Sequence, residues 1–154
     1  HGGANEAVMH NLLEIRTPAR AEKWLRDKQA AKELVMGFGH RVYKQGDSRV
    51  PTMRAALEDL AAWKGDIKWL EISDVLQNIM IGEKGIHPNL DFPAGPAYYL
   101  MGFEIDMYTP IFVMSRITGW AAHIFEQNAS NSLIRPLSVY GGAKQRKVKP
   151  IAKR

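Results

Sequence analysis

The 154-residue chain contains no cysteine and no long apolar run. The missing cysteine excludes disulfides, thiolate nucleophiles and thiolate-bound metals, and it fits a reducing cytoplasm, which is the location we expect. No segment approaches the roughly 20 apolar residues that a membrane span needs, so we expect no membrane partner. Apolar residues still make up 45% of the chain, which is ordinary for a folded domain.

The sequence also lacks the spacings of several common catalytic sites. No two histidines have the i, i+4 spacing of a helical metal site, and there is no serine elbow and no carboxylate cluster. We therefore expect neither a metal site nor serine hydrolase chemistry. Alternating strand patterns and internal repeats are absent as well, and this absence predicts an all-α fold.

The net charge of +5 comes from the C-terminal end of the chain. Residues 144–154 form a basic tail with six lysines and arginines and no acid, so the remaining residues sum to −1. A basic tail without interleaved aromatics is typical of a solvated terminus. Nucleic-acid binding is the less favoured alternative, and we expect no nucleic-acid partner.

Apolar periodicity and capping residues predict a series of helices. They are expected at about residues 5–15, 18–34, 51–63 and 67–84, in a short segment ending near 101, and at about 109–127. Asn5, Thr17 and Thr109 are the predicted N-caps, and Gly65 is a predicted stop. The last helix is apolar nearly all round, so we expect it to be buried.

The stretch "GFGHRVYKQGDSR", residues 37–49, combines glycines with cationic side chains. Gly37 and Gly39 allow a ligand to approach the backbone, and Lys44 and Arg49 add positive charge, so the loop could hold a phosphate or a carboxylate. The alternative is a glycine turn that ends a helix and carries solvated charges.

Four other side chains are candidates for chemistry. Neighbouring cations favour a neutral ring at His40, and a helix N-terminus favours a neutral ring at His1; the alternatives are a surface histidine and a chain end. Asp91 lies among prolines and apolar residues that would raise its pKa toward that of a useful base, although it could instead cap the following helix. Arg116 falls in the helix expected to be buried, where a guanidinium needs an anion.

Four motifs resemble the citrate synthase family in order and spacing: "HGGANEAV", "GFGHRVYKQGDSR", "PNLDF" and "TPIFVMSRITGWAAHIFEQ…LIRP". The resemblance covers the whole chain and corresponds to the C-terminal part of such an enzyme. Within the family, "MYTPIFVMSRITGWAAHIFEQ" and "IRPLSVYGG" are most similar to bacterial 2-methylcitrate synthases. The resemblance implies an all-helical homodimer, with residues 2–93 in a small domain and residues 94–154 in the large domain and dimer interface.

The resemblance also implies a reaction and a set of site residues. Propanoyl-CoA would condense with oxaloacetate to give 2-methylcitrate and CoA; acetyl-CoA, or use of both thioesters, is the alternative. No cofactor is expected beyond the CoA substrate. Asp91 would be the base, His1 would donate a hydrogen bond to the enol oxygen, and His40 would contact oxaloacetate.

Three arginines would hold the carboxylates of the substrate and product: Arg49, Arg116 and Arg135. Arg135 would come from the neighbouring subunit. The CoA-binding residues would be Leu34, Val35, Gly37, Phe38, Gly39, Lys44 and Asn89. Because family residues upstream of His1 are missing, we expect the chain to begin within a longer protein and to be inactive alone. A helical CoA- or nucleotide-binding module without chemistry is the alternative from another class.

Overall fold

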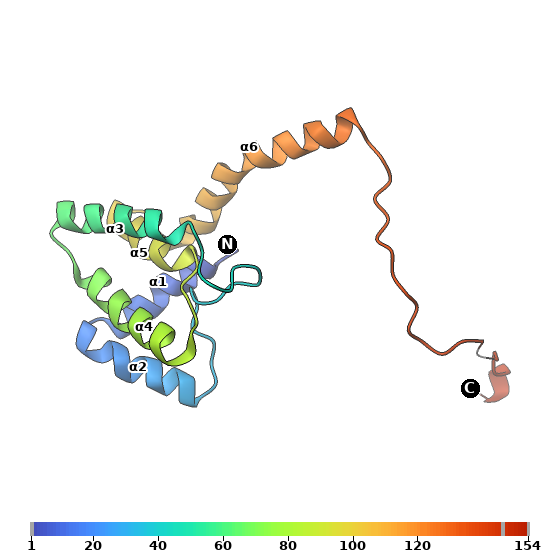
Figure 1. Cartoon of the computed structure of the whole chain (residues 1–154), viewed down its shortest axis with the longest axis horizontal. Helices are drawn as coiled ribbons and strands as arrows, with labels where there is room; N and C mark the ends of the chain where they lie inside the picture. The colour runs from blue at the N-terminus through green and yellow to red at the C-terminus, as the bar shows by residue number, and fades with distance from the viewer. Residues whose placement is uncertain (1, 146, 154) are drawn as a thin grey trace. The chain divides into compact units, whose positions relative to one another are not determined.

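The computed structural model describes residues 2–145 and 147–153, whose regular secondary structure is helical (Figure 1). The helices are α1 (Ala4–Ile15), α2 (Pro18–Ala30), α3 (Val50–Lys64), α4 (Lys68–Lys84), α5 (Asp91–Met101) and α6 (Tyr108–Ala129), with short 3-10 helices η1 (Ile105–Met107) and η2 (Ile151–Lys153). These residues contain no strand, only an isolated bridge between Phe38 and Pro88. The prediction of an all-α fold is confirmed.

The chain divides into two units, His1–Ile117 and Thr118–Arg154. The first contains α1 to α5 and the beginning of α6, and the second contains the rest of α6 and an exposed, largely irregular C-terminal segment. The domain boundary predicted near residue 93 concerns how the chain fits into a larger enzyme, and it stays a prediction.

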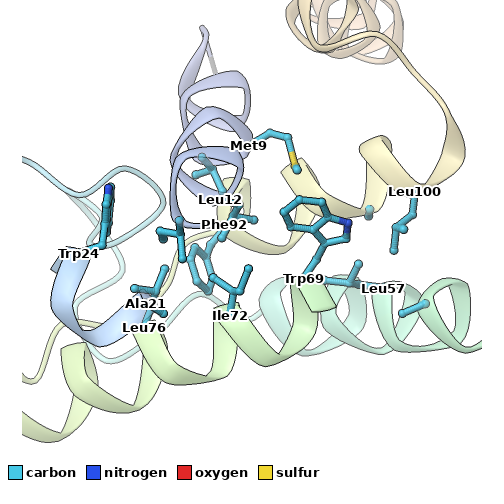
Figure 2. Packing of buried hydrophobic residues seen from close by; sticks show 14 of the residues in the cluster. Met9, Leu12, Ala21, Trp24, Leu57, Trp69, Ile72, Leu76, Phe92 and Leu100 are labelled. Atoms are coloured by element: carbon cyan, nitrogen blue, oxygen red, sulfur yellow. The ribbon is translucent and has the colours of Figure 1, made fainter. Parts of the chain in front are cut away.

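The core of the first unit is built around α5. This helix packs against both α1 and α3, while α2 packs against α4. Buried side chains from these helices form one apolar cluster that includes Leu12, Trp69, Ile72 and Phe92 (Figure 2). Burial of an aromatic side chain contributes about 2–3 kcal/mol, so Phe92 anchors the first turn of α5 in the core. The residue before it, Asp91, is held in place by the same packing.

Two predicted helix boundaries are confirmed and one is displaced. Thr17 is the N-cap of α2, with Pro18 at the first helical position. Gly65 ends α3 in the left-handed region, with φ of 69°. However, α2 ends at Ala30 and not near Leu34, because Lys32 adopts a positive φ that a helix cannot continue.

The predicted caps at Asn5 and Thr109 are wrong. Helix α1 follows Gly3, whose φ of 88° turns the chain one residue earlier, and Asn5 is 3% exposed inside the first turn. Helix α6 starts at Tyr108, and the N–H and hydroxyl of Thr109 both donate to the Glu6 carboxylate. An anion at a helix N-terminus is favourable, so Glu6 ties the start of α6 to α1.

The prediction that the last helix is buried is wrong for this chain. Among the α6 residues only Tyr108 is buried, and large apolar side chains such as Met114, Ile117 and Phe125 are exposed. The reason is that, within the described part of the chain, no helix packs extensively along this apolar surface as α1 and α3 pack along α5. Among the described residues, no helix is long and apolar enough to cross a membrane.

The contact between α5 and α1 depends on a glycine. A Cβ atom at Gly95 would lie 2.9 Å from the carbonyl oxygen of Asn5 and 3.3 Å from Val8. We expect Gly95→Ala to lower the free energy of unfolding by about 1–3 kcal/mol, because the helices must separate to fit the methyl group. Urea denaturation of the chain measures this loss.

Gly82 in α4 provides the matched control, because a Cβ atom there meets nothing within 4 Å. Gly82→Ala is therefore expected to raise stability by about 0.5–1 kcal/mol through helix propensity alone. Equal effects of the two substitutions would contradict the close helix contact at Gly95.

Candidate active site

One cavity in the first unit brings together three of the predicted site residues. It has a volume of about 260 Å³, and Asp91, Arg49 and Arg116 contribute to its wall. The other lining residues are Asn5, Met53, Leu90, Ala94, Tyr98, Phe112 and Ser115. A carboxylate and two guanidinium groups thus line a space large enough for a small dicarboxylate.

Asp91 is the first residue of α5 and is only 7% exposed. Burial raises the pKa of its carboxyl group, and the positive charge of Arg49 and the His40 ring oppose this shift. The alternative in which Asp91 caps α5 is wrong, because the backbone N–H of Asp91 itself donates to Asn89 Oδ1 at 3.0 Å. Leu90 is the N-cap residue, Asn89 before it accepts the Asp91 N–H, and the Asp91 carboxyl group contributes to the cavity wall.

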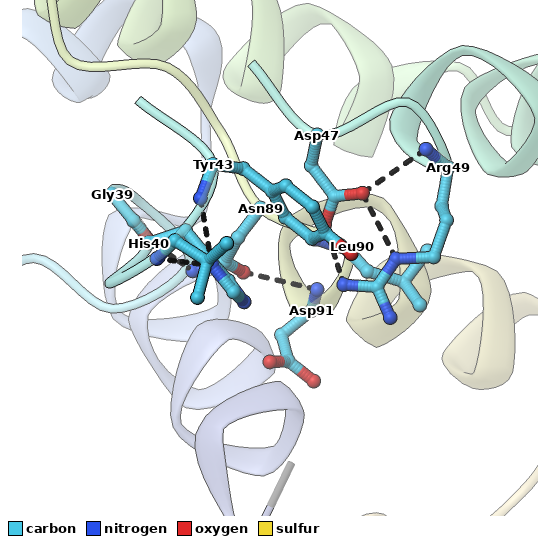
Figure 3. Close-up of polar contacts among 9 residues, drawn as sticks. Gly39, His40, Tyr43, Asp47, Arg49, Asn89, Leu90 and Asp91 are labelled. Carbon is cyan, nitrogen blue, oxygen red and sulfur yellow. Dashed lines mark hydrogen bonds and ion pairs between the residues drawn. The ribbon is translucent and has the colours of Figure 1, made fainter. Parts of the chain in front are cut away.

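The Asn89 amide also joins the glycine loop to α5. Its Nδ2 donates to the Gly39 carbonyl at 2.9 Å; Figure 3 shows these two residues beside Asp91. The backbone N–H of Asn89 donates to the Gly37 carbonyl at 2.9 Å. Gly39 N–H in turn donates to the His87 carbonyl at 2.8 Å. Two segments about fifty residues apart in the sequence are therefore paired directly beside the start of α5.

His40 follows this pairing and is held in one tautomer. Its Nδ1 accepts the backbone N–H groups of Val42 at 3.0 Å and Tyr43 at 3.2 Å, so the ring proton of the neutral form lies on Nε2. The ring stacks on Tyr43 with centroids 4.5 Å apart. Lys44 Nζ donates to the His40 carbonyl at 3.0 Å. The loop thus presents a single N–H donor on the imidazole.

Arg49 is held by Asp47, a residue that the sequence reasoning missed. The Asp47 carboxylate accepts Arg49 Nε at 2.9 Å, Nη2 at 2.7 Å and the backbone N–H at 3.0 Å (Figure 3). These bonds lower the pKa of Asp47 to about 2. The guanidinium also lies over the Tyr43 ring, 5.5 Å from its centroid. The only sequence signal was an aspartate two residues before a cation.

The other predicted carboxylate-binding residues are placed differently. Arg116 lies on α6 above the Phe112 ring at 4.9 Å and is exposed, so the expectation that burial obliges it to meet an anion is wrong here. Arg135 is exposed in the second unit. His1 lies outside the described residues.

Five of the seven predicted CoA-binding residues line two further hollows, and Gly37 and Asn89 line neither. Leu34, Val35 and Phe38 line one of about 330 Å³, where Lys32 and Lys84 supply positive charge.

Gly39 and Lys44 line the second hollow, of about 380 Å³, together with His40. His40 therefore contributes to the wall of a different hollow from Asp91, and Asn89 connects the two. Within residues 2–145 and 147–153, no group of three or more histidines and acids is arranged to hold a metal ion.

Besides Asp47, which is not part of the cavity wall, sequence reasoning missed two polar residues that line it. Asn5 carries an amide into the wall and has Oδ1 bonded to the Glu6 N–H, while the Ser115 hydroxyl donates to carbonyls of the preceding helical turn. Neither residue has a local sequence pattern that marks it as part of a cavity, so only the folded structure identifies them.

Residues 1–137 match the family model described as citrate synthase, C-terminal domain. The chain belongs to the citrate synthase family. Family membership predicted from the four motifs is thereby confirmed. Since the match covers the glycine loop, α5 and most of the remaining chain, the cavity described above lies within the shared domain.

Two mycobacterial members of the citrate synthase family are similar to this chain over 95% of its length. It is 64% identical over 146 residues to the 2-methylcitrate synthase of Mycobacterium tuberculosis, covering 95% of this chain and 37% of that protein. It is 62% identical to a citrate synthase of Mycolicibacterium smegmatis, covering 95% and 39%.

A solved structure shares the fold. The citrate synthase of Thermoplasma acidophilum, in a ternary complex with carboxymethyl coenzyme A and oxaloacetate, is 42% identical with a TM-score of 0.81 and covers all of this chain. The chain covers 42% of that structure, so it spans about two-fifths of the length of the relatives that it matches.

Proposed function

We propose that this chain forms the catalytic C-terminal part of a 2-methylcitrate synthase, which condenses propanoyl-CoA with oxaloacetate. The alternative is acetyl-CoA as in a citrate synthase, or both thioesters. The observation that carries the proposal is the cavity whose wall contains the buried Asp91 together with Arg49 and Arg116. The complete enzyme is a cytoplasmic homodimer that needs no cofactor, in which the exposed apolar surface of α6 faces the second subunit.

Each side chain has a role in this reaction. Asp91 removes a proton from the α-carbon of the thioester, and the resulting enol carbon attacks the ketone carbon of oxaloacetate. Water then hydrolyses the thioester and releases CoA. The raised pKa of Asp91 makes its carboxylate a stronger base than an exposed aspartate.

The remaining roles concern binding. Arg49 and Arg116 hold the carboxylates of oxaloacetate, and Arg135 contributes from the neighbouring subunit. His40 donates its Nε2 proton to oxaloacetate, and His1 stabilises the enol oxygen. Residues 34–39, Lys44 and Asn89 receive the CoA arm, for which the two hollows beside the glycine loop provide space.

The test measures CoA release by the full-length enzyme that contains this chain. Propanoyl-CoA and acetyl-CoA are each supplied with oxaloacetate, and the products are identified by mass. We expect release only when oxaloacetate is present, and a higher kcat/KM for propanoyl-CoA; one methylene is worth about 1–3 kcal/mol, or roughly 10- to 200-fold. A preference for acetyl-CoA would favour the citrate synthase alternative. CoA binding without any release would instead favour a module without chemistry.

A further inference from the structure

We propose that Asp47 is a positioning residue of the condensation site, whose single carboxylate fixes both the Arg49 guanidinium and the start of the helix that carries Asp91. The inference rests on the proposed function, in which Arg49 binds oxaloacetate and Asp91 is the base. Asp47 would thus set the position of the Arg49 guanidinium relative to the Asp91 carboxyl group.

The hydrogen bonds of Asp47 connect two elements. Oδ1 accepts the backbone N–H and Nε of Arg49, the residue that precedes α3. Oδ2 accepts Nη2 of the same guanidinium at 2.7 Å and also the backbone N–H of Leu90 at 3.3 Å. Leu90 is the N-cap of α5, directly before Asp91. One carboxylate therefore links the N-terminal ends of α3 and α5.

The burial of Asp47 makes this link rigid. Its side chain has no exposed surface, whereas Arg49 retains 39% exposure toward solvent. A bidentate pair with a planar guanidinium fixes direction as well as distance. Arg49 donates to Asp47 through Nε and Nη2, and this pair fixes the orientation of the guanidinium. The remaining N–H donors of Arg49 therefore point in a defined direction.

Charge adds a second effect. Because the pKa of Asp47 is lowered to about 2, its carboxylate remains ionised throughout the working range of an enzyme. This fixed negative charge raises the pKa of Asp91, while Arg49 and His40 lower it and burial dominates. Arg116 is the other charged group on the cavity wall, and α1 contributes the uncharged Asn5. Figure 3 shows the Asp91 side chain extending away from Asp47, so the influence between them acts through space.

Asp47→Asn in the full-length enzyme tests the inference, because it keeps the shape and removes the charge. The KM for oxaloacetate is expected to rise about tenfold or more, because the charge-assisted pair that orients Arg49 is weakened. The change in kcat should be smaller. Loss of the negative charge should also move the acid limb of the kcat/KM profile to lower pH, because Asp91 then loses its proton more easily.

Asp74→Asn is the matched control. Asp74 forms a similar bidentate pair with Arg54, at 2.7 and 3.2 Å, but neither residue lines the Asp91 cavity. This variant is expected to leave the KM and the pH profile unchanged. A merely structural role of Asp47 would lower the melting temperature in the same way as Asp74→Asn without moving the profile, and that result would overturn the inference.

Asp47→Glu keeps the charge but displaces the guanidinium, so it is expected to raise the KM while the acid limb stays near that of the parent enzyme. If Asp47→Asn does not fold, this variant decides: an unchanged KM would overturn the proposal. Absence of condensation by the parent enzyme would instead reject the proposed function, which keeps the two failures distinct.

Discussion

Asp91→Asn in the full-length enzyme is expected to lower kcat by about 10²- to 10⁴-fold, the usual worth of a positioned general base. The amide has nearly the same shape as the carboxyl group but cannot accept the proton of the thioester. Oxaloacetate affinity should be retained, because Arg49 and Arg116 remain in the cavity wall. Steady-state kinetics and calorimetric titration with oxaloacetate measure the two effects separately.

The same substitution has an expected sign for stability. Burial raises the pKa of Asp91 in the folded chain, so its ionised form costs stability at pH values above that raised pKa. Asp91→Asn should therefore leave the chain at least as stable at neutral pH, while the parent chain gains stability as the pH falls through the raised pKa. Lost activity with retained stability separates a catalytic role from a structural one.

Asp66→Asn is a suitable control, because Asp66 also stands near a helix start, where its Oδ1 accepts the Lys68 N–H at 3.2 Å. It lies outside the cavity wall and should leave kcat unchanged. Turnover by Asp91→Asn within tenfold of the parent enzyme would refute the assignment of the base.

Gly37→Ala is expected to have the largest effect on stability, a loss of about 2–4 kcal/mol. Part of the loss is the left-handed backbone, with φ of 89°, which costs a residue with a Cβ about 1–2 kcal/mol. The rest comes from overpacking, because the new atom would lie 2.7 Å from Val8 and 2.8 Å from the Phe92 ring. Urea denaturation of the chain gives the free energy of unfolding.

Gly39→Ala separates these two terms. Its φ of 76° carries the same backbone cost, but the nearest atom to its Cβ, on Ile86, is 3.7 Å away. A loss of only about 1–2 kcal/mol is therefore expected. If both variants lose the same amount, the tight packing of Gly37 against α1 and α5 contributes nothing.

The fold class was predictable because its signals are local. Apolar periodicity gave the helices, and Thr17 with Pro18 and the stop at Gly65 marked boundaries that need no distant partner. The caps at Asn5 and Thr109 failed for the opposite reason. Glu6, more than a hundred residues from Thr109, binds the start of α6, and such a contact leaves no local pattern.

The candidate site was predictable only in part. Asp91 and Arg49 have side chains whose chemistry suits the reaction, and the cavity includes both. Asp47 has no such pattern, because its importance arises from bonds to Arg49 and to Leu90, which lies 43 residues further along. The burial expected for Arg116 was wrong because an apolar sequence does not specify which surface will cover it.

Asn89 couples the position of the glycine loop to that of Asp91, the proposed base. Its side-chain amide is bonded at one end to Gly39 and at the other to the backbone of Asp91. A ligand that displaces the loop backbone would either move the first turn of α5 or break one of these hydrogen bonds. Displacement of the loop would thus be transmitted to the Asp91 backbone through the two hydrogen bonds of one side chain.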